Sequence, residues 1–200
     1  AQTSVAGDAV AYAVATDVNE NIYVTGEFSS SQVTFGPYTL FNSQVGQAEA
    51  FLVKYDSNGN VLWARSVGGS NNDFARSVAV DPAGNVYLAG WFEETILVIG
   101  NDTLHNIYFN TQQNFFLVKY DPSGNIVWTK CAGGQAYVNN AFVTTDLFGH
   151  VYLAGSYGGP NIVFENDSLQ PSVMMSVHMF LVKYDTSGTE TWLKGWENPN

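Results

Sequence analysis

The chain has 200 residues, 46% of them hydrophobic and 12% charged, with a formal net charge of −11, a composition typical of a globular protein with a packed core and few charges. No segment approaches the roughly 20 consecutive apolar residues of a membrane-spanning helix, so membrane insertion is not expected. The single cysteine, Cys131, excludes an intrachain disulfide, and the negative charge argues against nucleic acid as a partner.

Three copies of one unit follow each other along the chain. The hexapeptide Phe-Leu-Val-Lys-Tyr-Asp occurs at 51–56, 116–121 and 180–185, so its copies lie 65 and 64 residues apart. A tryptophan follows each copy at the same spacing, at Trp63, Trp128 and Trp192. Six of the seven basic residues also recur with this period and therefore form no basic patch. A residue that recurs with the repeat is explained by architecture before it is explained by chemistry.

Each repeat contains two hairpins in the order strand, turn, strand. Each turn opens on an aspartate, whose side chain accepts backbone hydrogen bonds inside a tight turn. The spacing of these aspartates alternates between 39 or 40 residues and 25 residues. The six are Asp17, Asp56, Asp81, Asp121, Asp146 and Asp185. The second turn of each repeat also carries a glycine (Gly59, Gly124 and Gly188), which supplies the left-handed residue.

Between the two hairpins of each repeat lies a longer and less similar connection. Its copies, 33–40, 98–104 and 164–169, predict a small extra hairpin in each repeat. The flanking segments are rich in β-branched and aromatic residues with little polar alternation, which favours strands covered on both faces. We therefore predict an all-β fold, an array of three four-stranded antiparallel blades like those of a β-propeller, at residues 1–67, 68–132 and 133–200. A β-solenoid fits less well, because its coils are shorter.

The hexapeptide, the Asp-x-x-Gly turn, the tryptophan and the Tyr-x-x-Gly strand (Tyr23–Gly26 in the first copy) together resemble the bacterial seven-bladed β-propeller repeat family. This resemblance covers nearly the whole chain and implies a secreted or cell-surface protein with no shared catalytic residues. One departure stands two residues before the phenylalanine of the hexapeptide. The family often has aspartate there, and this chain has Glu49, Asn114 and His178.

Three blades are too few to close a propeller, which needs roughly four to eight. Each terminal blade would therefore expose an apolar face, and such faces drive association. Three arrangements follow: the chain is an excerpt of a longer propeller, two copies close into a six-bladed ring, or copies add head to tail into a filament. The chain opens on Ala-Gln-Thr-Ser, which fits either an excerpt or the removal of a leader.

The familiar catalytic and metal-binding patterns are missing from the sequence. The segment from Asp56 to Asn60 begins like a calcium loop, but its twelfth position is Val67 instead of glutamate. His105, His150 and His178 share no repeat position, and no Gly-x-Ser-x-Gly elbow occurs. We therefore expect no metal, no cofactor and no enzyme. Asn101 and Asn166 match the N-glycosylation pattern, but Asn-Asp at these positions is also ordinary turn chemistry.

A possible ligand site stands where the middle repeat departs from its neighbours. Trp91 replaces Glu27 and Ser156, and Glu93 and Glu94 follow it closely. A tryptophan beside carboxylates could stack on a sugar, but packing against the adjacent blade or subunit is the favoured interpretation. Glycoside hydrolysis is less suited, because neighbouring residues on a strand point to opposite faces. The main hypothesis is a non-catalytic extracellular scaffold or adhesion protein that self-associates or forms part of a larger surface protein. A module binding surface polysaccharide is the alternative.

Overall fold

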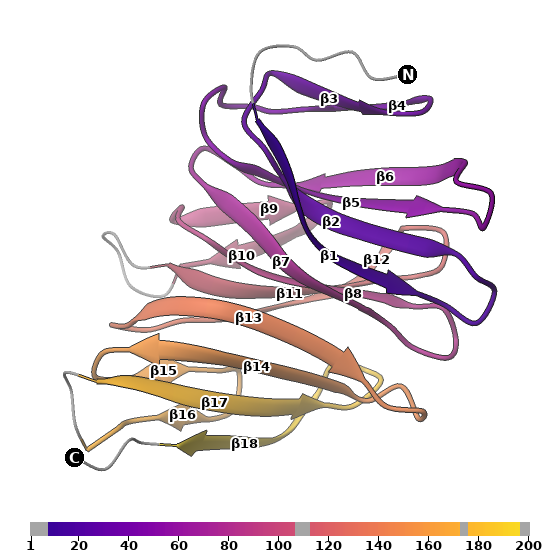
Figure 1. The fold of residues 1–200 in the computed structure, drawn as a ribbon. Helices are drawn as coiled ribbons and strands as arrows, with labels where there is room; N and C mark the ends of the chain where they lie inside the picture. Colours follow the sequence, from indigo (N-terminus) through magenta and orange to yellow (C-terminus); the bar gives the residue numbers. More distant parts are fainter. Residues whose placement is uncertain (1–7, 107–112, 173–175, 197–200) are drawn as a thin grey trace.

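The computed structural model describes residues 8–106, 113–172 and 176–196. Within these ranges the chain forms strands and turns, and no helix is long and apolar enough to span a membrane. Three four-stranded antiparallel sheets follow one another along the chain and lie stacked side by side without closing into a ring (Figure 1). The predicted all-β array of three blades is therefore confirmed.

Each blade is built from four strands that are adjacent in the order of the sequence, apart from the inserted hairpin. Blade 1 contains β1 (Ala9–Thr16), β2 (Ile22–Phe28), β5 (Glu49–Tyr55) and β6 (Val61–Val67). Blade 2 contains β7 (Asp73–Val80), β8 (Val86–Phe92), β11 (Asn114–Tyr120) and β12 (Ile126–Ala132). Blade 3 contains β13 (Tyr137–Thr145), β14 (Val151–Gly158), β17 (Val177–Tyr184) and β18 (Glu190–Trp196).

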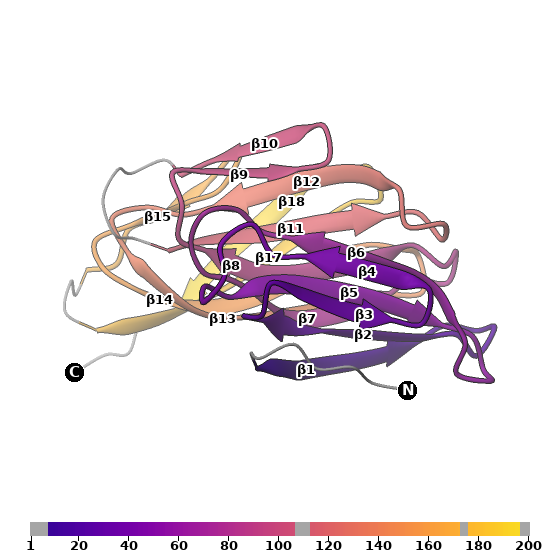
Figure 2. The same cartoon turned by 90° about the horizontal axis from the view of Figure 1, so that it is seen from above.

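The extra hairpin predicted inside each repeat is present in all three blades. The three hairpins are β3 (Gln32–Phe35) with β4 (Tyr38–Phe41), β9 (Ile96–Ile99) with β10 (Asp102–His105), and β15 (Ile162–Val163) with β16 (Ser168–Leu169). Each packs beside the last strand of its own blade, as Figure 2 shows for β9–β10 next to β12. The hairpins thus fill the space along the outer strand and explain the unusual length of the repeat.

The repeated hexapeptide covers both faces of its sheet, because successive side chains of a strand point to opposite sides. In blade 2, Phe116 and Val118 pack toward blade 1, while Phe115 and Leu117 pack toward blade 3. We call the face toward the preceding blade the leading face and the face toward the following blade the trailing face. Both faces of blade 2 are buried, which is why its strands lack polar alternation.

The main cores lie between blades. One joins the trailing face of blade 1 to the leading face of blade 2, and another joins blade 2 to blade 3 in the same way. The first strand of each blade packs on the preceding one: β7 lies against β1, β2 and β5, and β13 lies against β7, β8 and β11. The turns opened by Asp17, Asp81 and Asp146 line one common hollow. The blades are therefore arranged about a shared axis, as in a propeller.

All six predicted aspartate turns are present. In each, the aspartate carboxylate accepts hydrogen bonds from the backbone N–H groups two and four residues ahead. Gly59, Gly124 and Gly188 have φ angles of 81°, 79° and 86°, so they hold the left-handed position expected of them. The first turn of each blade has one more bond, from a tyrosine hydroxyl to the aspartate.

Because of this tyrosine bond, we expect the first turn of a blade to contribute more to stability than the second turn. Asp81 is buried and accepts hydrogen bonds from Ala83 N, Asn85 N, Asn85 Nδ2 and Tyr87 Oη at 2.8–2.9 Å. We expect Asp81→Ala to lower the free energy of unfolding by about 3 kcal/mol, because it strands a buried tyrosine hydroxyl. Asp56→Ala removes three similar bonds in an exposed turn and is the matched control. Equal losses in urea denaturation of the two variants would contradict this ranking.

Candidate functional site at the blade junctions and the open face of blade 3

The junction between blades 1 and 2 is closed by a lysine and a tryptophan that recur in the repeat. Lys54 Nζ donates to the carbonyl oxygen of Pro122 at 3.1 Å, and Trp63 Nε1 donates to the same oxygen at 3.2 Å. Lys54 Nζ also lies 5.2 Å from the ring centroid of Tyr23, a cation–π arrangement. The turn of one blade is therefore held by the trailing face of the preceding blade.

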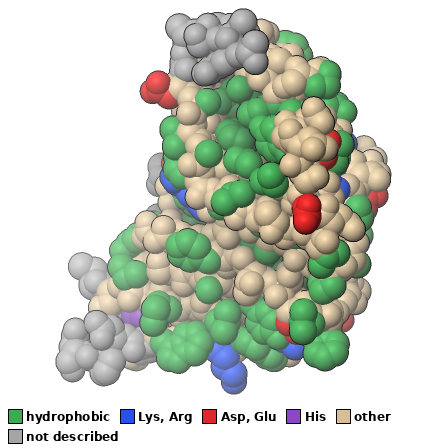
Figure 3. Space-filling view, turned by 45° about the vertical axis from the view of Figure 1, so that its right-hand side comes forward, with side chains coloured by type: hydrophobic (Ala, Val, Ile, Leu, Met, Phe, Trp, Pro, Cys, Tyr) green, Lys and Arg blue, Asp and Glu red, His purple; other side chains and the backbone are tan. Residues whose placement is uncertain are grey.

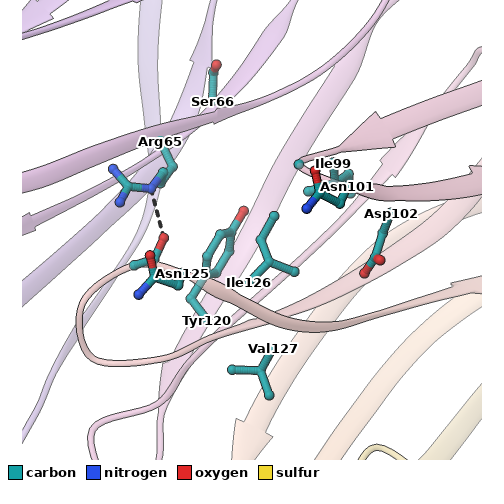
Figure 4. Close-up of a pocket in the computed structure, with 11 residues that line it drawn as sticks. Arg65, Ser66, Ile99, Asn101, Asp102, Tyr120, Asn125, Ile126 and Val127 are labelled. Atoms are coloured by element: carbon teal, nitrogen blue, oxygen red, sulfur yellow. Dashed lines mark hydrogen bonds between the residues drawn. The ribbon is translucent and has the colours of Figure 1, made fainter.

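Arg65 adds a second bond at the outer rim of this junction. Its Nε donates to Gly124 O at 2.8 Å, and its guanidinium lies 5.5 Å from the ring of Trp63. A cleft opens beside it, with Tyr120 and Asn101 in its lining, as Figure 4 shows. Asn101 lies in the β9–β10 turn, as predicted, and its glycosylation stays a prediction. The cleft belongs to the blade 1–2 junction.

The junction between blades 2 and 3 repeats the arrangement. Lys119 Nζ donates to Thr186 O at 2.9 Å and lies 5.4 Å from the ring of Tyr87. Trp128 lies beside Gly188 of the following turn. The place of the arginine is taken by Lys130, which forms an ion pair of 2.7 Å with Glu165. Residues at the same repeat positions thus join both pairs of neighbouring blades, although Trp128 Nε1, unlike Trp63 Nε1, has no hydrogen-bond partner among the described residues.

Blade 3 carries the same set on its trailing face, but no further blade covers it. Lys183 Nζ lies 5.3 Å from the ring of Tyr152. Lys54 and Lys119 are only 7% exposed, whereas Lys183 is half-buried. Met179 is 58% exposed, whereas its counterparts Ala50 and Phe115 are buried, and it lines an apolar hollow with Phe142, Leu181 and Trp196. Figure 3 shows hydrophobic side chains with a basic one among them at the lower end, over blade 3.

A cluster of three carboxyl groups is buried where blade 1 passes into blade 2. Glu49 begins β5, Asp73 begins β7 and Glu94 follows β8, and each is at most 6% exposed. Glu49 Oε2 and Asp73 Oδ2 both lie within 3.0 Å of the point that a Cβ on Gly68 would occupy. Asp73 Oδ1 and both carboxyl oxygen atoms of Glu94 are buried without a hydrogen-bond partner among the described residues, which favours the protonated, uncharged forms.

Burial raises the pKa of all three groups, and the charge of Glu94 adds to the rise for Glu49 and Asp73. The pKa of Glu49 rises from 4.5 to about 7, through burial first and the charge of Glu94 second. The pKa of Asp73 is raised by burial and by Glu94, and burial raises that of Glu94. The equivalent positions of the next junction hold the neutral residues Asn114 and Val138. No group of three or more acidic, histidine or cysteine side chains in the described part of the chain is arranged to hold a metal ion.

The three residues of the predicted ligand site are not brought together. Trp91 packs toward the blade 2–3 core, half-buried, with its ring 4.0 Å from that of Phe74. Glu94 lies on the other side, beside Gly69 in the connection from blade 1. Glu93 Oε2 accepts a hydrogen bond from Asn72 Nδ2 at 3.0 Å. Sugar binding by these residues stays a prediction. The expectation that Glu93 and Glu94 lie on a strand is wrong, because β8 ends at Phe92.

Two features of the site were only partly visible in the sequence. Lys54, Lys119 and Lys183 occupy one repeat position, but the hydrogen bonds of Lys54 and Lys119 to the next turn depend on residues about 67 positions away. Glu49 stood out as a departure from the family pattern, whereas Asp73 was missed. The signal for Asp73 is that an acidic residue stands where the other blades have Ala9 and Val138.

Comparison with known proteins agrees with this architecture. The profile of the β-propeller repeat family matches residues 62–91, which run from β6 of blade 1 to β8 of blade 2. This chain carries a β-propeller repeat. An uncharacterized WD repeat-containing protein of Acanthamoeba polyphaga mimivirus is 30% identical over 211 residues. The match covers 90% of this chain and 15% of that protein.

A second relative of the β-propeller-repeat chain is the regulatory protein FlaEY of Caulobacter vibrioides. It is 34% identical over 110 residues, which cover 55% of this chain and 12% of that protein. The chain therefore spans only a small part of the length of either relative. What the β-propeller repeat and the WD repeat-containing relative support in common is a repeat scaffold.

Proposed function

We propose that this chain is a non-catalytic β-propeller-repeat scaffold of the cell exterior, which associates with further blades through the open face of blade 3. One observation carries the proposal. The trailing face of blade 3 keeps the tyrosine, lysine and tryptophan that close both internal junctions, and no described residue covers them. Exposed apolar surface of this kind marks an association site.

Two further points support a scaffold in preference to an enzyme. The polar groups that recur in the repeats already have structural roles, since the aspartates hold turns and the lysines bind turn carbonyls. The buried acids of the first junction come from both blades and lie beside Gly68 and Gly69 in the connection between them. The position outside the cell and an adhesive role rest on the resemblance of the repeat alone.

The proposal predicts that the purified chain assembles. We expect sedimentation velocity to show species well above the 21.8 kDa of one chain at micromolar concentration. Negative-stain images should show rings or filaments, because a heterologous contact either closes or continues. Urea at a concentration that leaves the near-ultraviolet spectrum unchanged should weaken the assembly, since the contact is largely apolar. A folded and monodisperse 21.8 kDa monomer at every concentration would refute the proposal.

A further inference from the structure

The two internal junctions show what the open face of blade 3 is shaped to hold. At each junction, the lysine of the preceding blade binds the carbonyl that directly follows the turn aspartate, at Pro122 and at Thr186. The tryptophan of the preceding blade lies against the turn glycine: a Cβ on Gly124 would be 3.0 Å from Trp63, and one on Gly188 would be 2.9 Å from Trp128. We call the tyrosine, lysine and tryptophan on the trailing face of a blade its socket. A turn of one blade therefore meets the socket of the preceding blade twice in this chain.

A third turn of the same kind has no socket. In the turn of blade 1, which Asp56 opens, Ser57, Asn58 and Gly59 are exposed, and a Cβ on Gly59 would have no neighbour within 4 Å. Gly124 and Gly188, by contrast, are buried. The tyrosine before the turn shows the same difference. Tyr120 and Tyr184 are 1% and 2% exposed, whereas Tyr55 is only half-buried.

A third socket of the same kind has no turn. It consists of Tyr152, Lys183 and Trp192 on the trailing face of blade 3, and all three are half-buried. The tyrosine and lysine of both filled sockets are at most 7% exposed, and Trp63 is 6% exposed, whereas Trp128 is half-buried like Trp192. Among the described residues, no turn carbonyl meets the Lys183 ammonium group. The unused turn lies in the first blade and the unfilled socket lies in the last blade, so they stand at the two ends of the stack (Figure 1).

We propose that the socket of Tyr152, Lys183 and Trp192 receives the Asp56–Gly59 turn of a second copy of this chain. Lys183 Nζ of one copy then donates to the carbonyl oxygen of Ser57 in the other copy, and the ring of Trp192 packs on Gly59. Tyr55 of the second copy becomes buried against the socket. This inference rests on the proposed self-association and specifies its contact. The contact joins different surfaces of the two copies, so it is heterologous.

Both halves are already in the conformation that the internal junctions use. The φ angle of Gly59 is 81°, compared with 79° and 86° at the occupied turns. Lys183 Nζ lies 5.3 Å from its tyrosine ring, compared with 5.2 and 5.4 Å at the filled sockets. Because little ordering is needed on docking, the contact loses little of its interaction energy to conformational entropy.

Two variants test the contact, one on each side. Gly59→Asn adds a side chain that would meet Trp192 of the other copy, and asparagine tolerates a left-handed φ. Gly46→Asn is its matched control, since Gly46 has a φ of 95°, also lacks neighbours within 4 Å, and lies outside the turn. Lys183→Glu replaces the donor with a carboxylate, which would face the carbonyl oxygen of Ser57 in the other copy. We expect Gly59→Asn and Lys183→Glu each to raise the dissociation constant at least about tenfold, and Gly46→Asn to leave it unchanged.

Mixing the two variants gives the sharpest result. Gly59→Asn keeps an intact socket and Lys183→Glu keeps an intact turn, so each is expected to be monomeric alone. Their equimolar mixture should form a one-to-one dimer that grows no further. Sedimentation velocity measures this, and near-ultraviolet circular dichroism checks that each variant is folded.

The outcomes separate this inference from the proposed function. If the wild type is monomeric at all concentrations, self-association itself fails, and this inference fails with it. If the wild type assembles and both variants assemble equally well, the turn-in-socket contact is wrong while the scaffold proposal stands. If both variants are monomeric but their mixture forms no dimer, the pairing of this turn with this socket is wrong.

Discussion

Raising the pH from 5 to 9 is expected to weaken the junction between blades 1 and 2. Glu49, Asp73 and Glu94 have raised pKa values in the folded protein, about 7 for Glu49. The folded state therefore binds protons more tightly than the unfolded chain in this range, and stability falls as pH rises. The change in the pKa of Glu49 alone corresponds to about 3 kcal/mol. Urea denaturation at several pH values measures the loss.

An isosteric variant identifies the groups responsible. Asp73→Asn keeps an acceptor for the Gly69 N–H, which donates to Asp73 Oδ2 at 2.9 Å, and removes one of the acidic groups whose pKa burial and Glu94 raise. We expect this variant to be more stable than the wild type at pH 9 and to depend less on pH. Glu165→Gln, in which an exposed carboxylate is neutralised, should keep the wild-type dependence. A wild-type stability that is constant between pH 5 and 9 would contradict the argument.

Gly90→Ala is expected to disrupt the middle blade. The register of β7 against β8 shifts between Ala75 and Ser77, and this bulge brings the backbone of β7 over Gly90. A Cβ on Gly90 would overlap the carbonyl oxygen of Phe74 and lie 2.7 Å from the ring of Phe116. Because backbone atoms must move, we expect a loss of about 3 kcal/mol or more in the free energy of unfolding.

The control for this substitution is a glycine whose neighbour can move. A Cβ on Gly195 would meet only the end of the Leu169 side chain, at 2.9 Å, and the equivalent positions hold Ser66 and Cys131. Gly195→Ala should therefore change stability by less than about 1 kcal/mol. Thermal melting compares the two variants, and similar melting temperatures would contradict the role given to Gly90.

Much of the fold could be predicted because each repeat carries its own local signals. The aspartate and glycine of each turn, for example Asp56 and Gly59, act through hydrogen bonds and φ angles within five residues. The extra hairpins were also predicted, since their strands pair within a few residues of each other. The hexapeptide predicted strands covered on both faces, and both faces of β11 are buried.

The candidate site could be predicted only in part, because its contacts join distant positions. Trp91 was singled out for breaking the repeat, but the sequence does not show that its ring packs on Phe74, on the side of blade 2 away from Glu94. The acidic cluster combines Glu49, Asp73 and Glu94 from three elements, and only the stacking of two blades brings them together.

The sequence by itself determined three β-rich repeats, the turns between their strands and a number of blades too small to close a ring. These properties follow from local backbone geometry and from the two-residue periodicity of strands. Only the tertiary structure decided which side of each hexapeptide faces which blade, and that the socket of Lys183 and the turn of blade 1 have no partner among the described residues. The reason is physical: the contact between a repeat lysine and the turn of the next blade joins residues more than 50 positions apart, and its geometry depends on how the sheets stack.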